Sequence, residues 1–197
     1  NKGYDALNSR DLAKAAGVTT PTLYNLVGTK SEVLTALSVE TVDELEAMLK
    51  RINNNDALKF IEGIVLESRK MLEANNSFFR GSMIAMHQLS TTIDGHEAER
   101  NYGERCTEVA IHGCQLAQDQ GLLLGDISVT ALGEQLFTAY SAPWREWVYN
   151  RLSLDHFTIR VLRGFYMCLC CDATPVFLKH LRMKLSALPA EKGSLDR

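Results

Sequence analysis

Residues 8–30 read NSRDLAKAAGVTTPTLYNLVGTK, and this stretch decides the fold of the N-terminal part of the chain. Asn8 is a favourable N-cap for a first helix, which ends at Gly17, the residue type that most readily adopts the left-handed conformation after a helix. Thr19 provides a second N-cap, and Pro21 falls in the following first turn, where a missing N–H costs nothing. Two short helices joined by a glycine turn predict a helix-turn-helix, whose second helix has the size of a DNA major groove.

Composition describes an ordinary globular chain. It has 197 residues, of which 46% are hydrophobic and 23% are charged, and its formal net charge is −3. This charge argues against a protein that coats nucleic acid non-specifically, although residues 1–37 carry four basic and three acidic side chains. No apolar run approaches the ~20 residues of a membrane span. We therefore expect no signal peptide, no membrane association and a cytoplasmic location.

Helical periodicity runs through the rest of the chain, and the alternation typical of strands does not appear. We expect an all-α protein, with a helix-turn-helix domain over residues 1–38 and a larger helical domain over residues 39–197. A loop is predicted over residues 91–95. The helices after the helix-turn-helix are predicted over residues 30–51, 56–74, 78–90, 97–120, 128–150, 154–171 and 175–188.

The helix predicted over residues 154–171 is apolar on nearly every side. Between residues 157 and 171 only Arg160 and Arg163 are charged, and a helix of this kind must be buried on more than one side. Together with the helix over residues 128–150, its apolar surface predicts a homodimer. The predicted interface residues are Phe157, Val161, Gly164, Phe165, Cys168 and Leu169.

Aromatic and methionine side chains at helical spacing are candidates for a ligand cavity, although the same pattern fits an ordinary core. Pro143 lies inside a predicted helix and removes one backbone hydrogen bond, so we expect a kink that opens space beside Tyr140 and Trp144. These helix faces offer few Arg or Lys side chains, which favours a small apolar or aromatic effector. The predicted pocket residues are Phe79, Met83, Met86, His87, Tyr102, Tyr140 and Trp144.

The sequence predicts no catalytic centre, no metal site and no cofactor. None of the five histidines has a glutamate three residues before it, so the carboxylate-bridged di-iron pattern is missing. Cys168 and Cys171 share a helix face, which leaves a redox pair open beside a simple packing role. We expect reduced thiols and no enzymatic activity.

Four short stretches stand at a recognisable spacing: Gly3-Tyr4, RDLAKAAGV over residues 10–18, TLY over residues 22–24, and Lys30. On these residues the sequence resembles the TetR family of bacterial transcriptional regulators. The resemblance implies a homodimer, in which each subunit places one recognition helix in a major groove of double-stranded operator DNA. It also implies a small molecule, bound in the larger domain, that changes the separation of these helices.

The sequence departs from the family pattern in two places. Val27-Gly28-Thr29 replaces the usual aromatic residue and the Pro/Gly-Ser stretch, which should loosen the packing beneath the recognition helix. The helix that precedes Gly3-Tyr4 in the family has no counterpart, so we expect the DNA-binding domain to lack it.

The DNA-contacting residues are expected on and beside the second helix of the helix-turn-helix. Lys30 and Tyr24 are predicted to contact phosphates, and Thr20 to touch a base through its methyl group. Asn25 is suited either to pairing with an adenine or to contacting the DNA backbone. The predicted DNA-binding residues are Thr19, Thr20, Pro21, Thr22, Tyr24, Asn25 and Lys30.

These observations together predict a ligand-responsive, DNA-binding transcriptional regulator, a repressor that a small apolar effector releases from a palindromic operator. The alternative is a helical-bundle carrier or enzyme with no DNA-binding role. Salt-dependent binding to heparin distinguishes the two, because a carrier of net negative charge should not bind.

Overall fold

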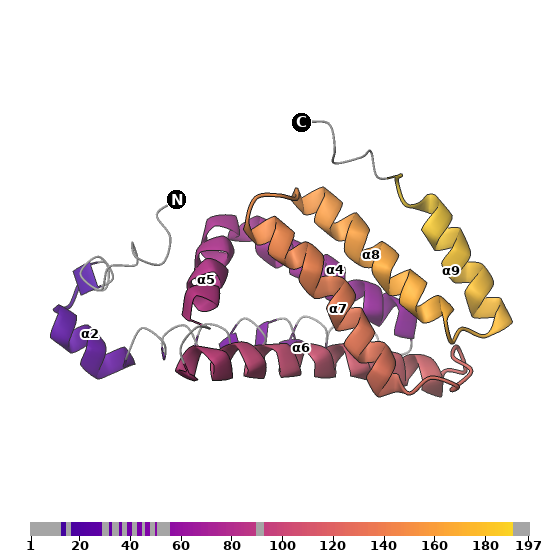
Figure 1. Ribbon diagram of the computed structural model, residues 1–197, viewed down its shortest axis with the longest axis horizontal. Helices are drawn as coiled ribbons and strands as arrows, with labels where there is room; N and C mark the ends of the chain where they lie inside the picture. The colour runs from indigo at the N-terminus through magenta and orange to yellow at the C-terminus, as the bar shows by residue number, and fades with distance from the viewer. Residues whose placement is uncertain are drawn as a thin grey trace. The chain divides into compact units, whose positions relative to one another are not determined.

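The computed structural model describes residues 13–14, 17–28, 32, 36, 39–40, 43–44, 46–47, 50, 56–89 and 93–190. This part of the chain contains helices and no strand, which confirms the all-α prediction (Figure 1). The helices are α2 (Thr20–Val27), α4 (Ala57–Ala74), α5 (Asn76–Leu89), α6 (Ile93–Asp119), α7 (Val129–Val148), α8 (Leu154–Cys170) and α9 (Pro175–Ala187).

The chain divides into two compact units. Unit 1 consists of residues 1–44 and 75–105, and unit 2 consists of residues 45–74 and 106–197. The functional boundary expected between residues 38 and 39 stays a prediction.

Most helix ends follow the capping residues of the sequence. Ser128 and Ser153 cap α7 and α8: the hydroxyl oxygen of each accepts a hydrogen bond from the backbone N–H three residues on, at 3.2 Å in both cases. The loop expected over residues 91–95 is wrong from Ile93 onward, where α6 already begins. Asp94 and Gly95, read as turn residues, occupy the first turn of this helix.

α8 forms the centre of unit 2, where it packs against α7, α9 and α4 (Figure 1). Its side chains Phe157, Val161, Phe165 and Leu169 recur every four residues and are at most 1% exposed. This spacing places them in one stripe along the helix. Burying each large apolar side chain contributes about 1.5–3 kcal/mol, so the stripe is a main source of the stability of unit 2.

Polar contacts tie the neighbouring helices to α8. The Tyr166 hydroxyl donates to the Glu62 carboxylate of α4 at 2.5 Å, and the Lys184 ammonium of α9 lies 2.9 Å from the same carboxylate. Burial, together with the hydrogen bond to Glu62, raises the pKa of Tyr166. Arg160 forms an ion pair with Glu146 of α7 at 2.6 Å. These contacts join α8 to α4 and α7, and the Glu62–Lys184 ion pair joins α4 to α9.

Asp172, between α8 and α9, fixes the loop that joins α6 to α7. Its side chain is 1% exposed. One carboxylate oxygen accepts from the Gly125 N–H at 3.0 Å, and the other accepts from the N–H groups of Asp126 and Ile127 at 3.0 and 3.2 Å. Hydrogen bonds to an ionised acceptor are stronger than neutral ones, so this carboxylate holds the start of α7 against the end of α8.

Candidate DNA-binding site

A glycine turn leads into α2. Gly17 has a φ of +68°, the left-handed conformation that the sequence predicted for it. Its N–H donates to the Lys14 carbonyl at 3.2 Å, and the Val18 N–H donates to the Ala13 carbonyl at 2.9 Å. These bonds satisfy carbonyl groups at the end of the preceding helix. The turn therefore ends one helix and directs the chain into the next.

The Thr19 side chain caps α2. Its Oγ1 accepts from the Thr22 N–H at 3.3 Å and lies 2.7 Å from the Thr22 hydroxyl oxygen. Pro21 lies in the first turn. The helix ends at Gly28, whose φ is +76° and whose N–H donates to the Tyr24 carbonyl at 2.9 Å. The predicted cap is confirmed, and it sets which residues of α2 face outward.

Most of the predicted DNA-binding residues of α2 are exposed. Ala13 is buried and Leu23 is half-buried, so one side of α2 is directed inward. Thr20 is half-buried as well, which makes it less available to a base than the sequence suggested. Lys30 lies outside the described residues. The exposed residues are Thr19, Pro21, Thr22, Tyr24 and Asn25.

Comparison with protein families identifies this region. Residues 1–37 match the family model described as bacterial regulatory proteins, tetR family. The chain carries the N-terminal domain of the TetR family. The TetR-type domain is a helix-turn-helix DNA-binding domain, and its presence supports a DNA-binding transcriptional regulator. Comparison of the chain with curated proteins and with solved structures gives no match.

Leu26 is an exposed residue of the TetR-type domain that the sequence analysis missed. Its side chain is 72% exposed. Leucine side chains are buried more often than exposed, so residue type alone does not single out Leu26 as a contact. The helical period does contain the signal, because Leu26 lies four residues after Thr22 and so shares its face.

The residues predicted for the ligand pocket belong to both units. Phe79 is buried, Met83 is half-buried and His87 is exposed on α5, while Tyr102 is half-buried on α6; all four lie in unit 1. Met86 lies on α5, and its side chain is outside the described residues. The remaining two residues, Tyr140 and Trp144, lie in unit 2. The single pocket formed by all seven stays a prediction.

In unit 2, Tyr140 and Trp144 belong to an aromatic cluster. Their rings stack with centroids 5.8 Å apart, and both rings meet Phe157 of α8 edge-on, at 5.5 and 6.2 Å. Burial raises the pKa of Tyr140. α7 runs as one helix through Pro143 to Val148. The cluster therefore joins α7 to α8.

Most of the predicted interface residues serve the protomer itself. Phe157, Val161, Phe165 and Leu169 form the buried stripe of α8 described above. Gly164 lies against Ala139 of α7, where a Cβ would come within 2.9 Å of the Ala139 Cβ. Cys168 is half-buried. Within the protomer, α8 packs against α4, α7 and α9, and the part of these residues in a homodimer stays a prediction.

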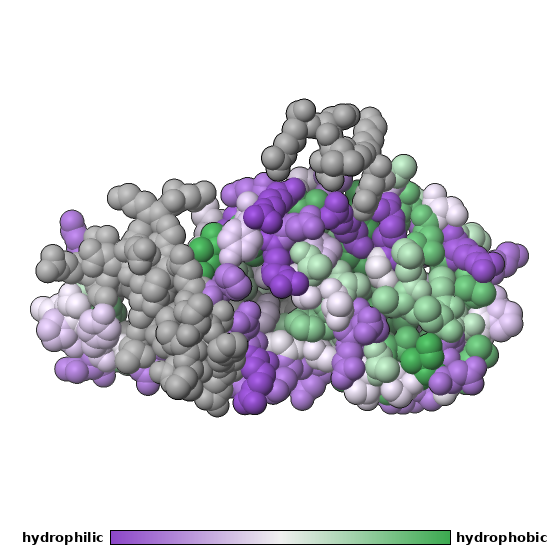
Figure 2. Space-filling view, viewed as in Figure 1, coloured by the Kyte–Doolittle hydropathy of each residue, from purple (hydrophilic) through white to green (hydrophobic). Residues whose placement is uncertain are grey.

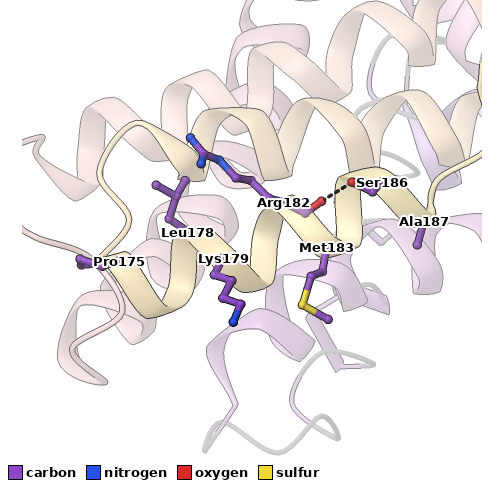
Figure 3. Close-up of a pocket in the computed structure, with 7 residues that line it drawn as sticks. All are labelled: Pro175, Leu178, Lys179, Arg182, Met183, Ser186 and Ala187. Atoms are coloured by element: carbon purple, nitrogen blue, oxygen red, sulfur yellow. Dashed lines mark hydrogen bonds between the residues drawn. The ribbon is translucent and has the colours of Figure 1, made fainter.

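Part of the apolar surface that remains in unit 2 lies on α9 and near the end of α8. Val176 and Met183 are 84% and 63% exposed, and Met167 of α8 is exposed too. Figure 2 shows hydrophobic and hydrophilic residues side by side in the region of α9. A groove of about 610 Å³ follows α9, and Figure 3 shows its lining. The lining residues are Pro175, Leu178, Lys179, Arg182, Met183, Ser186 and Ala187.

Three cysteines, Cys114, Cys168 and Cys170, have environments that favour the protonated thiol. Burial, with a smaller contribution from the neighbouring Cys168, raises the pKa of Cys114 to about 12. Burial also raises the pKa of Cys168 and of Cys170. Since the thiolate is the reactive form, these environments disfavour the redox pair and favour packing.

The described part of the chain contains neither a metal-binding cluster nor a membrane-spanning helix. No group of three or more His, Cys, Asp or Glu side chains there is arranged to hold a metal ion. Among the described helices, none has the length and apolar character needed to cross a membrane.

Proposed function

We propose that the chain is a ligand-responsive transcriptional regulator, acting as a repressor. It binds a pseudo-palindromic operator in the cytoplasm as a homodimer and leaves it when a small apolar or aromatic effector binds. The observation that carries this proposal is the exposed face of α2, held in register by the Gly17 turn and the Thr19 cap inside a TetR-type domain. Hydroxyl and amide side chains on such a helix suit phosphate and base contacts.

Salt-dependent DNA binding tests the proposal. The full chain is titrated by fluorescence anisotropy against a duplex selected from a random pool and against a random duplex, over a range of salt concentrations. Lys30→Ala should weaken binding to both duplexes alike and reduce the salt slope by about one unit per subunit, because one phosphate contact is lost in each.

Lys59→Ala is the matched control for this titration. It removes an exposed lysine of α4 that pairs with Asp56 in unit 2, outside the TetR-type domain, and should leave the salt slope unchanged. A wild-type chain that binds neither duplex would favour the alternative, a helical-bundle carrier or enzyme with no DNA-binding role.

The same titration separates base contacts from phosphate contacts. Asn25→Ala and Thr20→Ala should change the preference for particular base pairs, at a cost of about 1–3 kcal/mol for each good contact. Since Thr20 is half-buried and Asn25 is exposed, we expect the larger effect from Asn25.

For the homodimer, we place the interface on the exposed apolar side chains of α9 and the end of α8. The TetR-type domain supports dimerisation. Met167, Val176 and Met183 leave apolar surface in contact with water, and burying it against a second copy contributes about 25 cal/mol per Å².

Release of DNA requires that the effector bind the non-DNA conformation more tightly. Regulation of this kind needs a coupling free energy of about 1–3 kcal/mol between the two sites. One contact in unit 1 supports such coupling: the Asp43 carboxylate accepts from the Arg105 guanidinium of α6 at 2.8 Å. This ion pair joins α6 to the chain segment between α2 and α4. Arg105→Gln is therefore expected to reduce the change in DNA affinity that the effector causes. The DNA affinity measured without effector should change less.

A further inference from the structure

Leu26 occupies an unusual position on α2. At about 100° per residue, Thr22 lies between Asn25 and Leu26 within an arc of roughly 100°. Leu23 lies outside this arc and is half-buried, whereas Thr22, Asn25 and Leu26 are all exposed. Leu26 is 72% exposed. The outward face of α2 therefore presents a hydroxyl, an amide and an isobutyl group next to one another.

These three groups are suited to different contacts in the major groove of DNA. Hydroxyl and amide side chains exchange hydrogen bonds with base edges, and an apolar side chain contacts the C5-methyl group of thymine, which is the one apolar group displayed there. A leucine cannot form hydrogen bonds with a phosphate or a base edge. Any sequence information that Leu26 carries must therefore come from contact with a methyl group.

We propose that Leu26 recognises a thymine in each operator half-site through its C5-methyl group, beside the polar contacts of Thr22 and Asn25. This inference rests on the proposed function, because it requires that α2 enter the major groove. It adds a specificity-determining residue, and it commits the operator to an A·T pair at the position that Leu26 faces.

Replacement of thymine by deoxyuridine tests the contact, because it deletes the methyl group and leaves base pairing unchanged. An operator is selected from a random pool with the full chain, and each thymine is then replaced in turn, symmetrically in both half-sites. At the thymine that Leu26 faces, deoxyuridine removes one methyl contact and should lower the affinity of the wild-type chain about fourfold per half-site. Leu26→Ala should bind the unmodified operator more weakly and be insensitive to deoxyuridine at that position, while it keeps the wild-type response at every other thymine.

Leu124→Ala is the matched control, because it removes another exposed leucine in unit 2. Its deoxyuridine profile should equal that of the wild type. Circular dichroism and thermal unfolding of Leu26→Ala should match the wild type, since an exposed side chain is removed.

The outcomes separate this proposal from the proposed function. If Leu26→Ala keeps the full wild-type deoxyuridine profile, the methyl contact is wrong and the proposed DNA binding still holds. The same conclusion follows if Leu26→Ala loses equal affinity for the selected and the random duplex. A wild-type chain that binds no duplex overturns both.

Discussion

Gly164 of α8 lies directly against Ala139 of α7: a Cβ built on Gly164 would be 2.9 Å from the Cβ of Ala139. A separation this short requires one helix to shift. Gly164→Ala is therefore expected to lower the free energy of unfolding by about 1 kcal/mol or more, despite the better helix propensity of alanine. Urea unfolding followed by circular dichroism measures the change.

Two further variants make the Gly164 prediction specific. Gly81→Ala in α5 adds the same methyl group where no atom lies within 4 Å, and it should stabilise the chain by up to about 1 kcal/mol. Ala139→Gly combined with Gly164→Ala should recover part of the loss by restoring the space. Equal effects of the two single glycine substitutions would contradict the close contact.

The second prediction separates the core of unit 2 from its surface. Phe165→Glu places an unpaired charge among side chains that exclude water, since Phe165 is 1% exposed, and it should unfold unit 2. Met183→Glu changes an exposed side chain and should leave the fold intact while it shifts dimers towards monomers. Circular dichroism and analytical ultracentrifugation report the two effects. A folded monomer from Phe165→Glu would instead return the interface to α8.

The third prediction concerns the carboxylate of Asp172. Asp172→Asn keeps the shape but removes the charge and turns one acceptor into a donor facing the backbone N–H groups of residues 125–127. The expected loss is about 1.5–3 kcal/mol of unfolding free energy. Asp126→Asn is the control, because its side chain is exposed and it should change stability little. A neutral Asp172→Asn would show that the loop is held by other contacts.

The fourth prediction is a pH dependence that comes from Cys114. Its pKa is raised by burial from 9.0 to about 12 in the folded chain, so the thiol ionises at lower pH when unfolded. The stabilisation is fully present below pH 9 and is lost as pH rises toward 12, by at most about 1.4 kcal/mol per pH unit. Cys114→Ala should make the fall in unfolding free energy above pH 9 shallower, measured by urea unfolding under a reductant. Cys171→Ala, which removes an exposed thiol, should leave the slope unchanged.

The helix-turn-helix could be predicted because its signals are local in the sequence. The surface that covers α8 could not be predicted in this way. The Gly17 turn and the Thr19 cap are each formed by residues within five positions of one another, so the sequence contains their whole cause. The stripe from Phe157 to Leu169 correctly indicated burial, but helical periodicity does not identify the covering surface. That surface includes α4, which lies about 90 residues earlier in the chain. Asp172 contacts residues 125–127, which lie 45–47 positions earlier in the chain, and no local sequence pattern predicts such a contact.

The last prediction concerns the effector. Compounds of apolar and aromatic character are screened by thermal shift on the full chain, and a stabilising compound is then titrated into the protein–DNA complex, where it should release the DNA. Met83 of α5 lies in unit 1 and Trp144 of α7 lies in unit 2, so Met83→Ala and Trp144→Ala test the two halves of the predicted pocket separately. Each substitution should weaken the binding of the compound by about 1–3 kcal/mol if the side chain contacts the compound. Leu124→Ala, which removes an exposed side chain from the loop between α6 and α7, is the control and should leave the affinity unchanged. A weaker affinity in only one of the two pocket variants would place the effector in that unit, and unchanged affinity in both would move the site elsewhere.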